Sequence, residues 1–231
     1  MTDSLEKTPK KISAMFNDIA GKYDFINDIT TLGLVRIWRK KIKKTIRPEK
    51  GDKILDIAAG TGTSSAAIFN DDVEIIAVDI SEKMIEVARK NYPNITFIQA
   101  DATQLPFEDN TFDITTISFG IRNINNPIKA LKEMYRVTKV GGKVVICEFS
   151  MPDNRAFKKL YKLYMKVVFK KVIRLFSDNF QAYSYLNESI IRWDSKEELA
   201  EKMFRAGWRE IGYKTMTFGT VTLHKGSKNK A

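Results

Sequence analysis

The sequence contains one cysteine, one histidine and no long apolar run, and each scarcity excludes a class of protein. The single cysteine, Cys147, allows no intrachain disulfide, and its place in the run Lys-Val-Val-Ile-Cys-Glu-Phe predicts a small core side chain. A zinc site of the usual Cys/His type is excluded, and we expect no metal. No apolar stretch approaches the roughly 18 residues that cross a bilayer, and the first residues lack the pattern of a secretory signal. We therefore expect a cytoplasmic protein.

Basic charge, in contrast, is abundant and concentrated. The formal net charge is +11, and the isoelectric point is about 9.5. Residues 155–174 hold eight Lys/Arg and no Asp or Glu, and a second basic run occupies residues 36–47. Such localised charge predicts an acidic partner surface, either nucleic acid or anionic lipid.

The hydrophobic pattern predicts one α/β domain over residues 1–231, with a helical N-terminal cap at 1–50, a ligand-binding core at 51–150 and a substrate- or membrane-facing part at 151–231. The core should contain strands at 53–58, 73–79, 95–100, 112–118 and 143–149, alternating with helices at 63–70, 81–91 and 126–138. This alternation indicates a parallel, doubly wound sheet. Beyond it we expect helices at 155–176 and 196–206, strands at 208–216 and 218–225, a turn at Gly141-Gly142 and a loose tail from Lys225.

A glycine loop follows the first strand, in the run Asp56-Ile-Ala-Ala-Gly60-Thr-Gly62. Gly60 and Gly62 allow the backbone to approach a nucleoside, and Asp79 at the end of the next strand can accept hydrogen bonds from both ribose hydroxyls. Ser65 stands where a dinucleotide loop would have its third glycine. Together with Asp56, which would orient the loop and an ammonium group, this favours S-adenosylmethionine over NAD.

Two further polar sites end the third and fourth strands. Asp101-Ala102 follows the third, where Asp101 could accept the adenine amino group, and Ser118 ends the fourth. Ligands of open α/β sheets bind at the carboxyl ends of the strands, so these residues should converge with Asp56, Gly60 and Asp79 on one crevice.

Several longer segments resemble the menaquinone/ubiquinone biosynthesis C-methyltransferase family. The matching segments include Met15-Phe16-Asn17-Asp18, Leu32-Gly33 with Trp38-Arg39, Leu105-Pro106-Phe107, Ser118-Phe119-Gly120-Ile121-Arg122-Asn123, Glu148-Phe149-Ser150, the block from Ala182 to Ile190, and Thr222-Leu223-His224. The resemblance covers nearly the whole chain. It implies the class I S-adenosylmethionine-dependent methyltransferase fold, which has a Rossmann-like seven-stranded sheet with helices on both faces. It also implies cofactor contacts at Thr61, Asp79, Asp101, Ala102 and Ser118.

The resemblance further implies methyl transfer to a ring carbon of a polyprenylated quinol. The loop from Ala58 to Ser65 is similar to that of menaquinone-pathway members, which favours demethylmenaquinol. The alternative is the ubiquinone-pathway 2-methoxy-6-polyprenyl-1,4-benzoquinol. Many relatives carry an acid where Thr63 stands.

A quinol becomes a good carbon nucleophile when a ring hydroxyl loses its proton. Arg122, just past the fourth strand, is predicted to lower the pKa of that hydroxyl or to organise a water that takes the proton. The alternative is a salt bridge that fixes the loop. Asn123 could orient the same hydroxyl, Tyr23 could close over the pocket from the cap, and Glu148 is a further acid at the rim. His224 is expected to be a packed sheet residue.

The basic segment predicts an amphipathic helix. Lys158, Lys162, Lys166, Lys170 and Arg174 recur every four residues, and Phe157, Leu160, Tyr161, Tyr164, Val168 and Val172 form another face. Such a helix could lie on the anionic inner face of a membrane with its aromatic face toward the acyl chains. Alternatively, it packs on the domain with a solvated basic face.

Three other functions remain open from the residues. A nucleic-acid methyltransferase would explain the charge, but the fourth strand is not followed by Asn/Asp-Pro-Pro-aromatic and no Pro-Cys pair supplies a nucleophile, so we expect no specific nucleic acid. An inactive scaffold protein and a sterol or phospholipid methyltransferase are the others. The sequence leaves open whether the chain is a monomer or a homodimer.

Overall fold

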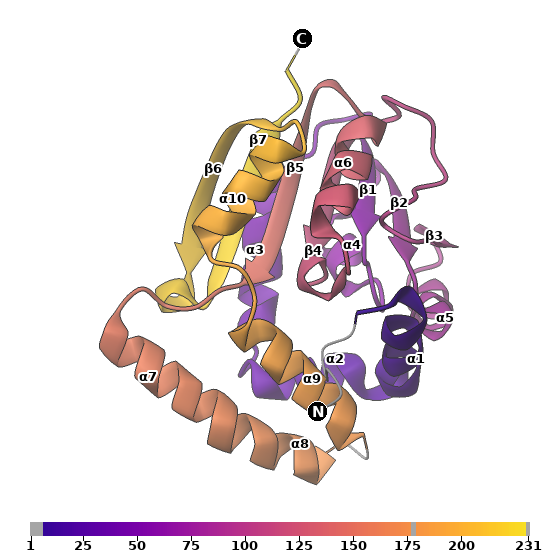
Figure 1. The fold of residues 1–231 in the computed structure, drawn as a ribbon. Helices are drawn as coiled ribbons and strands as arrows, with labels where there is room; N and C mark the ends of the chain where they lie inside the picture. Colours follow the sequence, from indigo (N-terminus) through magenta and orange to yellow (C-terminus); the bar gives the residue numbers. More distant parts are fainter. Residues whose placement is uncertain (1–6, 177–178, 230–231) are drawn as a thin grey trace.

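A computed structural model describes residues 7–176 and 179–229 and contains one seven-stranded sheet (Figure 1). The strand order is β3-β2-β1-β4-β5-β7-β6. The strands are β1 (Lys53–Ile57), β2 (Glu74–Asp79), β3 (Thr96–Gln99), β4 (Phe112–Ser118), β5 (Thr138–Phe149), β6 (Arg209–Met216) and β7 (Val221–Ser227). The first five pair in parallel, and β7 is antiparallel to both of its neighbours. The predicted doubly wound sheet is confirmed.

Helices cover both faces of this sheet. On one face α3 (Leu34–Ile46), α4 (Thr63–Ile68) and α5 (Glu82–Asn91) share a core with the strands, with Trp38 and Ile42 among its buried residues. On the other face α6 (Pro127–Val137) and α10 (Lys196–Arg205) pack around Met134 and Trp208. Ile54, Leu55, Asp56 and Ile57 of β1 are all buried because a central parallel strand is covered on both sides.

A further helical layer lies beyond one end of the sheet (Figure 1). It consists of α1 (Pro9–Ile19), α2 (Tyr23–Thr30), α7 (Arg155–Tyr164), α8 (Lys170–Phe176) and α9 (Phe180–Ile191). Its own core includes Ile26, Met165, Tyr183 and Leu186. The helices α1 and α2 and the chain from α7 to α9 therefore form one layer, although 124 residues lie between Thr30 and Arg155 in sequence.

The helix predicted at 155–176 is present, but a π-helical turn, η3 (Met165–Phe169), divides it into α7 and α8. The side chains of Lys170 and Val172 lie outside the described part of the structure. Helix α9 was not predicted. Among residues 7–176 and 179–229, no helix is both long and apolar enough to cross a membrane.

Two expectations near the sheet edge were wrong. Gly141-Gly142 does not separate β5 from the preceding helix but lies within β5, where the pairing register with β4 shifts between Phe112 and Ile114. The tail expected from Lys225 is ordered as far as Lys228, because β7 continues to Ser227 and Lys228 Nζ donates to the Thr138 carbonyl at 2.7 Å. Residues 230 and 231 lie outside the described chain. Cys147 is buried in β5, as predicted.

Candidate active site

A cavity of about 530 Å³ lies where the carboxyl ends of the strands meet the helical layer. Most of the site residues predicted from the sequence border it. They are Tyr23, Gly60, Thr61, Asp79, Asp101, Ala102, Ser118, Arg122 and Asn123. The convergence expected from the sheet topology is therefore present.

The glycine loop and Asp79 are held together by backbone hydrogen bonds. Gly60 adopts φ +57° and its N–H donates to Asp79 Oδ2 at 2.8 Å, while Ser81 N–H donates to Oδ1 at 2.8 Å. Burial raises the pKa of Asp79, and these hydrogen bonds oppose the rise. An ionised carboxylate offers about four acceptor sites, so Asp79 can still accept ribose hydroxyls.

Asp56 and Gly62, in contrast, lie behind the loop and do not border the cavity. Asp56 is fully buried, Oδ2 accepts from Ser65 Oγ at 2.6 Å, and burial raises its pKa to about 7. A Cβ on Gly62 would lie 2.7 Å from Phe97 Cζ. Asp56 therefore supports the loop through Ser65, and the structure places it behind the cavity lining rather than where we expected it to orient an ammonium group.

At the end of β4, Arg122 and Asn123 form a 3-10 turn, η2 (Ile121–Asn123). Arg122 Nη1 donates to Glu148 Oε1 at 2.8 Å, and the two side chains are 3% and 1% exposed. Nε donates to Ser189 Oγ at 3.3 Å. The salt bridge considered as an alternative role for Arg122 is thus present. Nη2 donates no hydrogen bond within the described chain.

Two buried polar atoms on the same side of the cavity also lack partners among the described residues. They are Asn123 Oδ1 and Ser118 Oγ. Buried polar groups are nearly always hydrogen-bonded in folded proteins, and each exception requires an explanation. Both residues border the cavity, so a ligand with hydrogen-bonding groups that binds there would lie close to these atoms.

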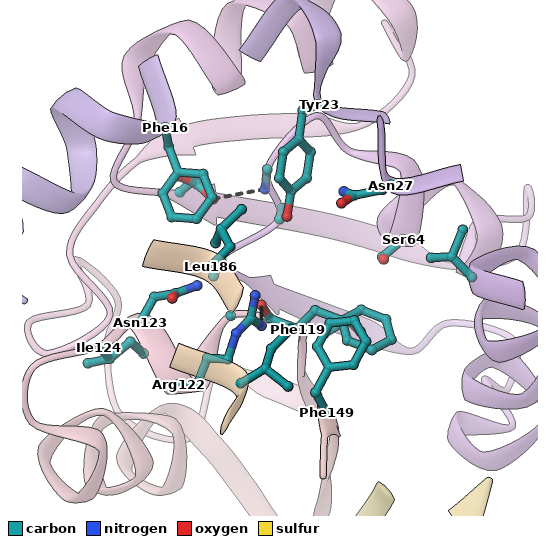
Figure 2. A pocket seen from close by; sticks show the side chains of 18 of the residues that line it. Phe16, Tyr23, Asn27, Ser64, Phe119, Arg122, Asn123, Ile124, Phe149 and Leu186 are labelled. Carbon is teal, nitrogen blue, oxygen red and sulfur yellow. Dashed lines mark hydrogen bonds between the residues drawn. The ribbon is translucent and has the colours of Figure 1, made fainter. Parts of the chain in front are cut away.

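Tyr23 faces Arg122 and Asn123 across the cavity, with Phe16 at its side (Figure 2). The rings of Phe16 and Tyr23 are 5.9 Å apart between centroids. Burial raises the pKa of Tyr23, so its hydroxyl stays protonated at neutral pH. Asn27, one turn further along α2, also borders the cavity. The N-terminal cap thus supplies part of the cavity lining through Tyr23 and Phe16.

Three aromatic rings form one wall near Arg122, and we call Trp38, Phe119 and Phe149 the aromatic wall. Their centroids are 4.8–5.9 Å apart. Phe119 adopts φ +59°, an uncommon conformation for an aromatic residue that the surrounding packing must maintain. The Arg122 guanidinium lies 5.2 Å from the Phe149 centroid. A planar ring could therefore bind beside the guanidinium.

The sequence reasoning missed several lining residues. Arg39 was quoted only as part of a motif, yet it borders the cavity and Nε is buried without a partner within the described chain. The nearest acid is Asp24, with Oδ1 4.0 Å from Nη2. Tyr183 and Leu186 reach the cavity from α9, whose helical spacing was a usable signal. His224, as predicted, is a packed sheet residue, and its Nε2 lies 2.8 Å from the Lys196 carbonyl.

The lining residues fit S-adenosylmethionine. Asp101 and Asp79 suit adenine and ribose, and Gly60 leaves open space. Arg39, whose Nε has no partner within the described chain, suits the carboxylate of the methionine part. This cofactor supplies an activated methyl group on a sulfonium. Together, the sheet order and this site define a class I S-adenosylmethionine-dependent methyltransferase.

The chain belongs to the ubiE/COQ5 methyltransferase family, whose model matches residues 2–228. It is 44% identical to a demethylmenaquinone methyltransferase of Streptomyces avermitilis over 225 residues, which cover 97% of both chains. It is 43% identical to that of Clavibacter sepedonicus, over 99% of this chain and 94% of the relative. The fold is also that of a Thermotoga maritima methyltransferase described as a possible histamine N-methyltransferase, with a TM-score of 0.68 over 94% of this chain at 21% identity.

Proposed function

We propose that this methyltransferase methylates a ring carbon of a polyprenylated quinol, demethylmenaquinol, to give menaquinol. The observation that carries the proposal is a single cavity with two chemically different parts. Asp79 and Asp101 border the part that suits a nucleoside, and the aromatic wall borders the part that suits an apolar ring. The names of the relatives favour demethylmenaquinone over a ubiquinone precursor.

The reaction requires the acceptor carbon to lie in line with the sulfonium methyl, and orientation alone can contribute about 7–11 kcal/mol. A ring lying against Phe149 would be held beside Arg122. Arg122 Nη2, which has no acceptor within residues 7–176 and 179–229, would donate to the ring oxygen as it becomes a phenolate. Asn123 Oδ1 would accept the hydrogen bond of the neutral hydroxyl and so orient it.

The proton itself leaves through water in this proposal. Glu148 does not border the cavity, and its carboxylate already accepts from Arg122 and from the Phe149 N–H at 2.8 Å. Tyr23 is kept protonated by burial, so it serves as a hydrogen-bonding group rather than as a base. Arg122, Asn123 and Tyr23 therefore bind and orient the quinol, and none of them has to be the final proton acceptor.

We also propose a peripheral contact with anionic membranes through residues 155–176. Basic and apolar side chains are exposed together on one face of this segment and support the proposal. The basic ones are Lys159, Lys162 and Lys166, and the apolar ones are Leu160 and Leu163. The face differs from the predicted one, since Phe157, Tyr161 and Tyr164 border the cavity. Basic and apolar side chains interleaved on one helix bind anionic bilayer surfaces.

Sedimentation with anionic vesicles tests the membrane contact. Reversing Lys159, Lys162 and Lys166 to Glu should abolish binding at physiological salt. A matched reversal of exposed Lys40, Lys41 and Lys44 in α3 changes the net charge equally and should retain binding. If both triple variants lose binding to the same extent, net charge rather than this helix is responsible.

The acceptor is tested with purified protein, labelled S-adenosylmethionine and three competing acceptors. These are reduced demethylmenaquinone, a demethoxyubiquinol analogue and bulk RNA. We expect label in menaquinol and little in the other two. Label in RNA but not in either quinol would overturn the proposal, and label in the benzoquinol alone would correct the substrate.

A further inference from the structure

A second cavity of about 680 Å³ is lined by residues from the start of α7 and from the turn η4 (Thr217–Gly219), which joins β6 and β7. Figure 1 shows the start of α7 near the ends of these two strands. We call it the outer groove. Its lining residues are Asp153, Asn154, Ala156, Phe157, Leu160, Thr215, Phe218 and Gly219. Phe157 also borders the first cavity, so the two spaces share a wall.

We propose that the outer groove holds the polyprenyl tail of the acceptor and that the tail leaves the active site between Phe157 and Phe218. The inference rests on the proposed function, because it assumes a quinol with a tail. The groove suits an isoprenoid chain because the lining contains no Lys or Arg, and its large side chains are the apolar Phe157, Leu160 and Phe218.

The shared wall is an aromatic pair at the surface. The rings of Phe157 and Phe218 are 5.2 Å apart between centroids. Phe218 is 82% exposed and Leu160 is 59% exposed, which is unusual for large apolar side chains that border a concave site. Apolar side chains that are exposed within a concave site are available to an apolar ligand.

The backbone holds Phe218 in this position at a conformational cost. Phe218 has φ +54° and Thr217 has φ +48°, values that β-branched and aromatic residues rarely adopt. Trp38 Nε1 donates to Thr217 Oγ1 at 2.8 Å and fixes the turn. Trp38 also belongs to the aromatic wall. The same residue thus borders the proposed ring site and fixes the mouth of the groove.

The lining of the first cavity reaches that mouth. Besides the aromatic wall it includes Tyr161, Thr217 and Thr220, and it shares Phe157 with the outer groove. A tail attached to a ring at the aromatic wall would therefore emerge between α7 and η4. From the groove it would reach the exposed face of α7, where Lys159 and Leu163 could contact a bilayer. The competing exit passes Leu32, which borders the cavity at the turn between α2 and α3 and is strongly exposed.

Ala156→Trp tests the groove because Ala156 is exposed, so a larger side chain fills the groove without entering the core. The tailed quinol and tail-less 1,4-naphthoquinol are compared as acceptors. We expect kcat/KM for the tailed quinol to fall at least tenfold and that for naphthoquinol to stay within twofold. The control Glu201→Trp lies at an exposed position of α10, outside both cavities and outside residues 155–176, and should affect neither acceptor.

A direct measurement is cross-linking with a quinol that carries a diazirine in its tail, followed by peptide mapping. Labelling within 156–160 and 215–219 is expected. Three results would overturn the inference. Ala156→Trp could lower kcat/KM equally for both acceptors, the label could appear at Leu32, or Leu32→Trp rather than Ala156→Trp could selectively lower kcat/KM for the tailed quinol. These outcomes differ from failure of the proposed function, in which the unaltered protein would methylate neither quinol.

Discussion

Arg122 and Glu148 form a buried ion pair in the wall of the active site, with Nη1 2.8 Å from Oε1. Removing one partner of such a pair leaves an uncompensated buried charge, which costs about 3–5 kcal/mol. We therefore expect Arg122→Ala to lose most turnover, to leave affinity for S-adenosylmethionine nearly unchanged, and to unfold at lower denaturant concentration.

The double variant Arg122→Met with Glu148→Gln separates the loss of turnover from the loss of stability. It removes both charges while keeping much of the packing, so the denaturant midpoint should largely recover. Turnover should stay low, because no cation remains beside the quinol oxygen. Recovery of turnover together with stability would mean that Arg122 only holds the loop in place.

Asp56 should make folding stability depend on pH. Burial raises its pKa to about 7 in the folded state, above roughly 3.9 in the unfolded chain. The folded protein binds this proton more tightly than the unfolded chain does. The resulting contribution of Asp56 to the free energy of unfolding is therefore fully present below about pH 4 and is lost as the pH rises through 7. Asp56→Asn cannot ionise, so it should gain on the order of 2–4 kcal/mol relative to the unaltered protein between pH 4 and pH 8.5. Urea unfolding at several pH values measures this, and a constant difference would contradict it.

Asp56 also illustrates what the sequence could and could not predict. The convergence of Asp79, Asp101 and Ser118 was predictable, because the carboxyl ends of parallel strands must meet at one edge. The position of Asp56 behind the loop, rather than at the cavity, was not predictable. It depends on how the loop folds over Ser65. Likewise, Arg39 and Trp38 belong to a cap whose position over the sheet is set by tertiary packing. Periodicity identifies the buried face of a helix but not the cavity that the helix borders.

Alanine substitutions at the two loop glycines should have different effects on stability and on cofactor binding. A Cβ on Gly60 meets nothing within 4 Å, so Gly60→Ala should cost only about 1–2 kcal/mol of backbone strain at its positive φ. The methyl group would enter the space for the cofactor and weaken its binding. Gly62→Ala should lose more stability, because its Cβ would lie 2.7 Å from Phe97 Cζ. Thermal unfolding and calorimetric titration distinguish these results, and identical behaviour of the two variants would refute the assignment.

Arg39 is expected to bind the carboxylate of S-adenosylmethionine. Its side chain is only 16% exposed and Nε has no partner within the described chain. A charge-assisted hydrogen bond contributes about 1.5–3 kcal/mol, so Arg39→Ala should weaken the cofactor roughly 10- to 100-fold. Affinity for 5′-methylthioadenosine, which lacks the amino-acid part, should remain unchanged in the same calorimetric titrations. The control Lys40→Ala, at the next position on α3, is exposed and should affect neither ligand. Equal weakening of both ligands by Arg39→Ala would instead indicate that Arg39 only positions the cap.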